Sequence, residues 1–393
     1  MMKIAFPILW IVLFAILSNS YRPILLIILC LYILLIRRNY KLHLPKYYFF
    51  IVVICCCGVL LGIVNISKNG IFDFLKDCIS FLSPLILWIC FSNIKTLSDI
   101  NNICTCLFVS SGLVGIYTLL AGLANISNGI TYYTFEPNIY IVICVILYLS
   151  APKEWVWIDK HRALSSLFMI TCCSTIFLTL SRTILLCLSV FLIVYAIKNI
   201  GNFIKITKYL ILLCIIMIII STLILSESTV SAFVDKILNS INEISFDNNI
   251  WTQEDIVTNW RGYERYRAID TFTNTNTLDA LFGNGFGYKL DVGQYASLVT
   301  DESGLFYLHD GYMNTMLKCG LLGLFSYVLF YALNIKNVFS KYINSKQYSK
   351  YFILCCFVLL AITTLFIQGL FVYSASFTFW IPIILFSSIK EEK

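Results

Sequence analysis

The sequence predicts an all-α polytopic membrane protein with about twelve transmembrane helices and one large, partly helical loop outside the membrane. Hydrophobic residues make up 59% of the 393 residues and charged residues only 12%, whereas soluble domains carry about 25% charged residues. The hydrophobic residues form long runs that short basic loops separate, and residues 226–312 form the one long polar stretch. The bilayer must therefore solvate most of the chain.

The apolar runs divide the chain into three regions. The predicted spans are 4–18, 22–36, 47–64, 74–93, 103–124, 139–151, 163–180, 183–197, 209–225, 313–333, 351–368 and 370–388. Residues 1–225 hold the first nine spans, 226–312 the large loop, and 313–393 the last three spans and a cytoplasmic end. Several runs are shorter than the roughly 20 residues of a straight spanning helix, so the seventh and eighth also fit a re-entrant or kinked pair. The first run alternatively fits a signal-peptide core, although the next run follows it within a few residues.

Lysine and arginine concentrate in alternate loops, as they do on the cytoplasmic side of membrane proteins. The predicted cytoplasmic segments carry Lys3, Arg37, Arg38, Lys41, Lys46, Lys95, Lys153, Lys160, Arg162, Lys198, Lys205, Lys208, Lys336, Lys341, Lys346, Lys350, Lys390 and Lys393. The short segments on the opposite side hold only Arg22, Lys68, Lys76 and Arg182. Both termini are therefore expected in the cytoplasm and the 226–312 loop outside. The net charge of +7 reflects this topology and does not indicate a nucleic-acid partner.

Cysteine and histidine usage predicts neither disulfides nor a metal site. The chain has 16 cysteines, but the runs Cys55–Cys57, Cys172–Cys173 and Cys355–Cys356 lie in apolar stretches, where cysteine behaves as a small hydrophobic residue. The 226–312 loop contains no cysteine, and none of the three histidines has ligand spacing to another histidine or to a cysteine pair. We therefore expect no metal and no cofactor.

The long loop contains helical and turn signals. Residues Val230–Ile244 show apolar positions at helical spacing, and a second helix is expected from Glu254 to Phe272. The glycines of Gly283–Gly287 lack the spacing of a dinucleotide fingerprint and predict a flexible turn. Gly320 and Gly323 would let the start of the tenth span pack closely against a neighbour, as small residues do in membrane bundles.

Three arginines stand out as candidates for binding an anionic group. Arg261 and Arg265 are four residues apart, which places them on one face of the predicted helix, and guanidinium groups bind phosphate oxygens in a bidentate manner. A solvated helix face paired to Glu264 or Asp270 is the alternative interpretation. Arg182 lies between two apolar spans with no acidic residue nearby, and an ionisable residue there suggests function. Its alternative is a side chain that extends to lipid phosphate.

His309 is the candidate general base, because it is the only histidine predicted on the outer face. An imidazole ordinarily titrates near pH 6.5 and can accept a proton at physiological pH. A purely structural histidine at a junction between loop and helix is the alternative. Asp310 could orient the ring, but an N-cap carboxylate for the following helix is the safer interpretation.

Four places in the chain resemble the O-antigen polymerase and O-antigen ligase superfamily of bacterial inner membranes. Ser181-Arg182 resembles the serine–arginine motif at the outer end of a membrane helix in this family. Arg261 to Ala268, followed by Leu281 to Gly287, is similar to its arginine–aromatic helix and glycine turn. His309 to Gly323 matches its pattern of a histidine, a polar residue, nine residues and Gly-x-x-Gly, and Glu136-Pro137-Asn138 resembles its Pro-Asn turn.

The resemblance covers about residues 130–330 and implies a metal-independent, cofactor-free membrane glycosyltransferase in the bacterial inner membrane. Its donor would be an undecaprenyl-diphosphate-linked oligosaccharide among membrane lipids, and a chain-length regulator protein would be a partner. Arg182 and Arg261 would hold the diphosphate and stabilise the charge that develops as it leaves. Arg265 and Asp310 would contribute to substrate binding, and His309 would take the proton of the acceptor sugar hydroxyl on the periplasmic side.

Within this superfamily the sequence favours an O-antigen polymerase, which joins lipid-linked repeat units. Asp310 stands where ligases usually carry Asn, Ser or Gln. The alternative is an O-antigen ligase, which transfers the finished polymer to lipid A-core. A lipid-linked oligosaccharide flippase is the third possibility, but it would be expected to show internal repeats and ionisable residues near the bilayer midplane. The sequence displays neither signal.

Overall fold

The computed structural model describes residues 2–17, 21–36, 44–92, 94, 97, 99–125, 137–179, 181–198, 251–293, 295, 304–371 and 376–389. Within these residues the regular structure is helical, with only an isolated antiparallel bridge between Leu290 and Leu305. The predicted all-α class is therefore confirmed for the described part of the chain. The predicted span 209–225, the stretch Val230–Ile244, Glu136 and much of the basic loops 37–46 and 198–208 lie outside it.

Among the described residues, four helices are long and apolar enough to cross a membrane: α5 (Ile71–Ser92), α6 (Ile100–Asn125), α16 (Gly311–Ser345) and α17 (Tyr348–Ile367). Shorter apolar helices accompany them: α1 (Met2–Ile16), α2 (Arg22–Ile36), α3 (Phe49–Val64), α7 (Ile141–Ser150), α9 (Arg162–Leu178), α10 (Arg182–Lys198) and α19 (Ile381–Ser387). Each predicted span within the described ranges coincides with helical structure. The chain is a multi-pass membrane protein, and its count of twelve spans stays a prediction.

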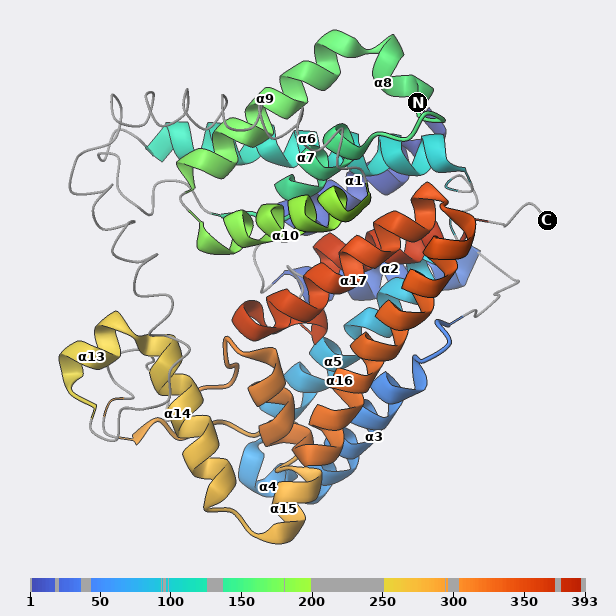
Figure 1. Ribbon diagram of the computed structural model, residues 1–393. Coiled ribbons are helices and arrows are strands. Elements are labelled where there is room, and N and C mark those ends of the chain that lie inside the picture. The colour runs from blue at the N-terminus through green and yellow to red at the C-terminus, as the bar shows by residue number, and fades with distance from the viewer. Residues whose placement is uncertain are drawn as a thin grey trace.

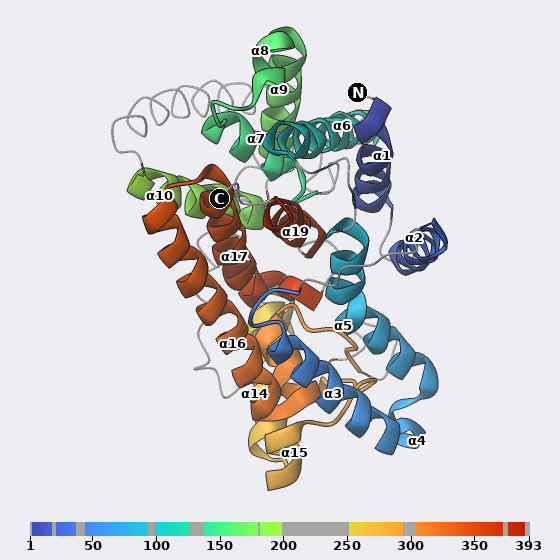
Figure 2. The same ribbon diagram turned by 90° about the vertical axis from the view of Figure 1, so that its right-hand side faces the viewer.

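The helices form two packed groups that meet at α17 and α19. In the first group α16 contacts α3, with α5 beside α3, and α4 (Ile66–Asn69) and α15 (Thr277–Phe282) lie at one end (Figure 1). In the second group α6 contacts α1, α7 and α9, with α8 (Val156–Lys160) at its edge (Figure 2). Two short helical segments, η4 (Gly369–Phe371) and η5 (Ser376–Trp380), precede α19, which contacts both α5 and α6.

A buried tryptophan joins several helices of this core. The Trp380 ring lies 6.1 Å from the ring of Tyr48, the residue before α3, 5.3 Å from that of Trp88 in α5 and 6.0 Å from that of Phe330 in α16. Its indole N–H donates to the Pro84 carbonyl of α5 at 3.0 Å. Aromatic packing with a satisfied polar tip is therefore what holds the end of the chain in the core.

α16 folds back on itself at Gly320, where the backbone is non-helical with φ 66° and ψ −167°. The rings of Tyr312 and Tyr327 are 5.4 Å apart, whereas fifteen residues of straight helix would separate their backbones by about 22 Å. A Cβ on Gly323 would lie 2.3 Å from the Cβ of Cys319, across this reversal. The predicted tenth span, 313–333, lies within α16, which is still long and apolar enough to cross a membrane, but the chain turns sharply at Gly320 inside it.

Gly320 is required at this reversal. Its positive φ suits glycine, and a Cβ there would lie 2.3 Å from the carbonyl carbon and oxygen of Leu281 in α15. The prediction that Gly320 permits close packing is thus confirmed, and the neighbour is a loop helix.

The predicted loop helix over Glu254–Phe272 is present as two helices, α13 (Gln253–Thr258) and α14 (Trp260–Thr273). A capping box starts α13, because the Thr252 side chain accepts from the amide of Asp255 and the Asp255 carboxylate accepts from the amide of Thr252. The Asn259 side chain accepts from the Gly262 amide and starts α14. The chain therefore bends at Asn259, and the second helix carries the candidate arginines.

Candidate functional site

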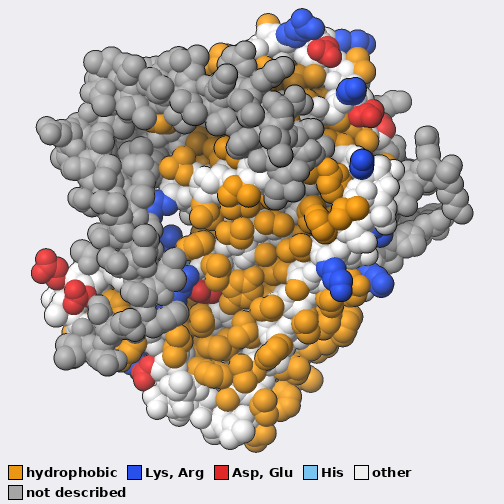
Figure 3. Space-filling model, in the orientation of Figure 1, with side chains coloured by type: hydrophobic (Ala, Val, Ile, Leu, Met, Phe, Trp, Pro, Cys, Tyr) orange, Lys and Arg blue, Asp and Glu red, His pale blue; other side chains and the backbone are white. Residues whose placement is uncertain are grey.

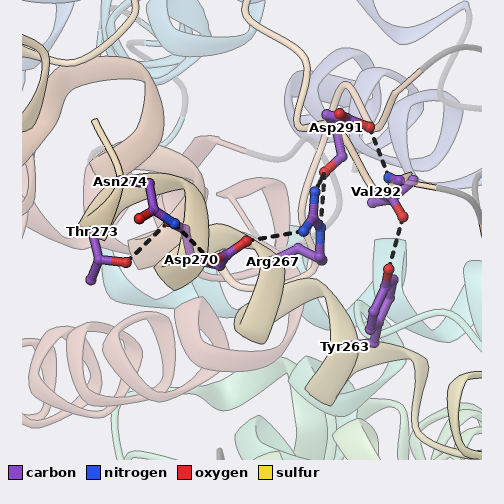
Figure 4. Close-up of polar contacts among 8 residues, drawn as sticks. Tyr263, Arg267, Asp270, Thr273, Asn274, Asp291 and Val292 are labelled. Carbon is purple, nitrogen blue, oxygen red and sulfur yellow. Dashed lines mark hydrogen bonds and ion pairs between the residues drawn. The ribbon is translucent and has the colours of Figure 1, made fainter. Parts of the chain in front are cut away.

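Hydrogen bonds attach the helix α14 to residues 291–292, as Figure 4 shows. The Tyr263 hydroxyl donates to the Val292 carbonyl at 2.8 Å, and the Arg267 guanidinium donates to the Asp291 carbonyl at 3.2 and 3.1 Å. Arg267 also pairs with Asp270 at 3.0 Å, so Asp270 has a partner other than Arg261 or Arg265. These contacts fix the rotation of α14, and the face that carries Glu264 and Arg265 meets His309 and Asp310.

The glycine turn docks on the membrane helices. Gly283, Gly285 and Gly287 all have positive φ, at 87°, 83° and 88°. The Gly285 amide donates to the Lys318 carbonyl at 2.9 Å, and the Gly287 amide donates to the carboxylate of Asp77 in α5 at 2.6 Å. The Phe286 amide also donates to the Gly58 carbonyl of α3 at 2.9 Å. The prediction of a turn is confirmed, but its backbone is hydrogen bonded to α3, α5 and α16, which a flexible turn would not be.

A buried ion pair lies beside this turn. The Lys318 ammonium in α16 is 2.6 Å from both carboxylate oxygens of Asp77 and donates to the Phe306 carbonyl at 3.0 Å. Both side chains are almost fully buried. The pair ties together α5, the glycine turn, the reversal in α16 and the segment that leads to His309. Neither residue was predicted to be functional, although a charged residue near the end of an apolar span is a usable signal.

His309 is held by a buried carboxylate from α14. The imidazole Nδ1 lies 3.0 Å from both carboxylate oxygens of Glu264, and the His309 amide donates to Glu264 at 3.1 Å. The Trp260 indole donates to the same carboxylate at 2.6 Å. The Glu264 side chain is only 3% exposed, whereas that of His309 is 46% exposed.

This geometry assigns the imidazole tautomer. An ionised carboxylate only accepts hydrogen bonds, so Nδ1 carries the proton that faces Glu264. The other ring nitrogen, Nε2, is then the basic one. The sequence predicts Glu264 only as an alternative ion-pair partner of Arg261 or Arg265. Its position one helical turn after Trp260 gives no hint of a partner 45 residues away.

Asp310 caps α16 and pairs with Arg265. Its carboxylate accepts from the amides of Tyr312 and Met313 at 2.9 and 3.1 Å and from Arg265 Nε at 2.9 Å. The N-cap interpretation is thus confirmed. Burial raises the pKa of the Asp310 carboxyl, and the Arg265 charge and the two amides oppose that effect. Arg265 Nη2 also donates to the carbonyl of Leu365 near the end of α17 at 2.5 Å.

The structure brings four residues together at the end of α17. Glu264 and Arg265 come from α14, and His309 and Asp310 come from the start of α16. The Gln368 amide donates to the His309 carbonyl at 3.0 Å, which fixes this cluster against the residue that ends α17. Arg261 lies one turn before Arg265 on the same helix and is partly exposed.

Arg182 is the first residue of α10 and is partly exposed. The other end of α10 packs on the start of α17, where the rings of Tyr195 and Tyr351 are 6.4 Å apart. Figures 1 and 2 show α10 running alongside α17. Because the two helices are antiparallel, Arg182 lies at the same end of the pair as Leu365, the residue that Arg265 contacts.

Comparison with known proteins gives one family. Residues 167–328 match the family model described as O-antigen ligase. The match runs from α9 past the reversal in α16 and includes Arg182, Arg261, Arg265, His309 and Asp310. No curated protein and no solved structure matches the chain.

Proposed function

We propose that the chain is an O-antigen polymerase of the O-antigen polymerase and ligase superfamily, a proposal supported by the match of residues 167–328 to the O-antigen ligase family model. It joins undecaprenyl-diphosphate-linked repeat units by metal-independent glycosyl transfer on the periplasmic face of the inner membrane, with both termini in the cytoplasm. The observation that carries this proposal is the half-exposed imidazole of His309, whose Nδ1 a buried glutamate holds. A chain-length regulator protein is its partner in this proposal.

His309 acts as the general base. The acceptor sugar hydroxyl loses its proton to Nε2 as its oxygen attacks the anomeric carbon of the donor, and such proton transfer typically contributes 10²–10⁴-fold to the rate. Glu264 keeps the Nδ1 proton in place and stabilises the imidazolium that forms, as the carboxylate of a catalytic triad does. Glu264 is therefore a positioning residue, and the hydrogen bond from the Trp260 indole helps to orient its carboxylate.

Arg182 and Arg261 bind the diphosphate. The bond from the anomeric carbon to the diphosphate oxygen breaks as the new glycosidic bond forms, and fixed guanidinium groups stabilise the charge left on that oxygen. Arg265 and Asp310 contribute to the substrate site by holding its parts together. Their ion pair joins α14 to the start of α16, and Arg265 also bonds to Leu365, so these contacts set the distance between Arg261 on α14 and His309.

A second candidate function, O-antigen ligase, is favoured by the description of the matching family model. In both reactions a sugar hydroxyl attacks a lipid-diphosphate-linked glycan, so the roles of His309 and the arginines are the same. The acidic residue Asp310, at a position where ligases usually carry a neutral polar residue, favours the polymerase.

The lipopolysaccharide ladder of a deletion strain tests the proposal. A polymerase deletion leaves core molecules that carry one repeat unit. A ligase deletion leaves core without repeat units and accumulates lipid-linked polymer, and a flippase deletion traps the precursor inside. Complementation with the intact gene should restore the long ladder, and complementation with a His309→Ala variant of equal abundance should not.

A further inference from the structure

We propose that α15, within the stretch predicted to be a periplasmic loop, is immersed in the lipids of the outer leaflet. Its three large apolar side chains point away from the protein: Leu278 is 68% exposed, Leu281 44% and Phe282 42%. Their spacing of three and four residues places them on one face of the helix. The polar side chains at the start of α15 have each other as partners, since Asn276 donates to the Asp279 carboxylate at 2.8 Å.

The apolar face of α15 cannot turn inward. The backbone of Leu281 and Phe282 lies directly against Gly320, where a Cβ would come within 2.3 to 2.5 Å of it. The next residue, Gly283, is equally close to the backbone of Lys318. The backbone of α15 therefore contacts α16 at the reversal, and the leucine and phenylalanine side chains of α15 remain on the outside.

The exposed face of α15 lies beside apolar surface on the membrane helices. Just after the reversal in α16, Leu322 and Phe325 are exposed, and Phe72 at the start of α5 is 84% exposed. Both α16 and α5 qualify as membrane-spanning helices. In Figure 3 apolar side chains cover the face of the molecule over α16 and α3, down to the end at which α15 lies.

The apolar face of α15 continues the apolar surface of α16 and α5, which indicates that lipid covers it. An apolar surface of this extent is unusual on a face in water, and α15 adjoins surfaces that lipid must cover. An amphipathic helix with Leu and Phe on one face is also the kind that inserts at a membrane interface. Since α15 lies beyond the end of α17 to which His309 is bound (Figure 1), lipid extends past the level of His309. The contact with lipid does not depend on the proposed function, and only its assignment to the outer leaflet rests on the topology proposed with it.

Photo-crosslinking in a bilayer tests the inference. The photoreactive residue p-benzoylphenylalanine is placed singly at Leu278 or Phe282, and the protein is reconstituted into nanodiscs of radiolabelled phosphatidylethanolamine and phosphatidylglycerol. Phe325 in α16 serves as the lipid-facing reference, and the exposed Thr273 in α14 as the water-facing control. We expect lipid adducts at 278 and 282 comparable to those at 325 and at least about fivefold above those at 273.

Absence of lipid adducts at 278 and 282 while position 325 labels would overturn the inference, and so would crosslinks to a protein chain instead. Hydroxyl-radical footprinting of the unmodified protein in the same nanodiscs gives a second measurement that needs no substitution. We expect Phe282 to be protected relative to the partly exposed Tyr266 of α14. Oxidation of both at similar rates contradicts lipid contact.

Discussion

Replacement of Glu264 by glutamine should remove most of the activity without unfolding the protein. The carboxylate accepts from three donors: the Trp260 indole, the His309 amide and His309 Nδ1. A glutamine amide offers one oxygen and one NH₂ group in the same volume. One of the three donors therefore faces another donor, and the exposed imidazole is the group that most easily changes its tautomer.

The size of the effect follows from that tautomer change. If the NH₂ group of glutamine faces Nδ1, the imidazole must carry its proton on Nε2, where it cannot accept the proton of the sugar hydroxyl. The corresponding carboxylate-to-amide change in a serine protease triad lowers kcat by about 10⁴. His309 is half-exposed and freer to rotate, so we expect a loss of about 10²- to 10⁴-fold in kcat, or about 3–5 kcal/mol in activation free energy.

The assay uses purified protein in nanodiscs and a lipid-linked repeat unit, and it measures kcat and KM separately. We expect KM for the donor to change little, because Glu264 does not touch the diphosphate in our proposal. Glu254→Gln, which alters an exposed residue of the same loop, is the matched control and should keep wild-type activity. Wild-type kcat in Glu264→Gln, with an unchanged pH profile, would refute the positioning role.

Three further predictions concern Arg182, Gly320 and the Asp77–Lys318 pair. Arg182→Lys should lose nearly as much activity as Arg182→Ala, because an ammonium cannot reproduce the bidentate contact of a guanidinium. Both variants are compared at equal protein abundance. Full activity in the lysine variant would mean that Arg182 only contacts lipid. Gly320→Ala should lower the melting temperature of the detergent-purified protein strongly or prevent folding. Gly70→Ala is the control, because Gly70 has φ 84° but its Cβ position meets only the Asp73 carboxylate at 3.8 Å, so the substitution should cost only backbone strain of about 1–3 kcal/mol. Equal stability of the two variants would contradict the reversal. Asp77→Asn or Lys318→Met alone should lower the free energy of unfolding by about 3–5 kcal/mol, and the double variant should recover part of this stability. Strictly additive losses of unfolding free energy would show that the two side chains are not coupled.

The sequence predicts the helical class and most helix positions because hydropathy is a local property. It does not predict the reversal at Gly320, since an averaged hydropathy profile is the same for a straight helix and for one that turns back. Gly320 and Gly323 do signal close packing. What they approach, the backbone of α15 in one case and Cys319 in the other, depends on contacts across the fold.

The candidate site shows the same division between local and distant contacts. The N-cap role of Asp310 is predicted because a cap is formed within three residues. The i,i+4 spacing of Arg261 and Arg265 correctly places them on one helix, but it does not show that Arg265 pairs with Asp310, 45 residues away. The pairing of Glu264 with His309 spans the same distance, and the Asp77–Lys318 pair spans 241 residues. Pairs of this kind are made by tertiary packing, which no spacing rule describes.

A single-turnover measurement on His309 variants shows whether His309 removes the proton of the acceptor hydroxyl. Purified wild type, His309→Ala and His309→Asn are loaded with a lipid-linked repeat unit, and formation of the dimeric product is followed. We expect donor binding to persist in both variants while product formation falls by at least about 10²-fold, in the asparagine variant as much as in the alanine variant, since asparagine keeps hydrogen bonding but cannot take the proton. Product formation at the wild-type rate in either variant would contradict this role of His309.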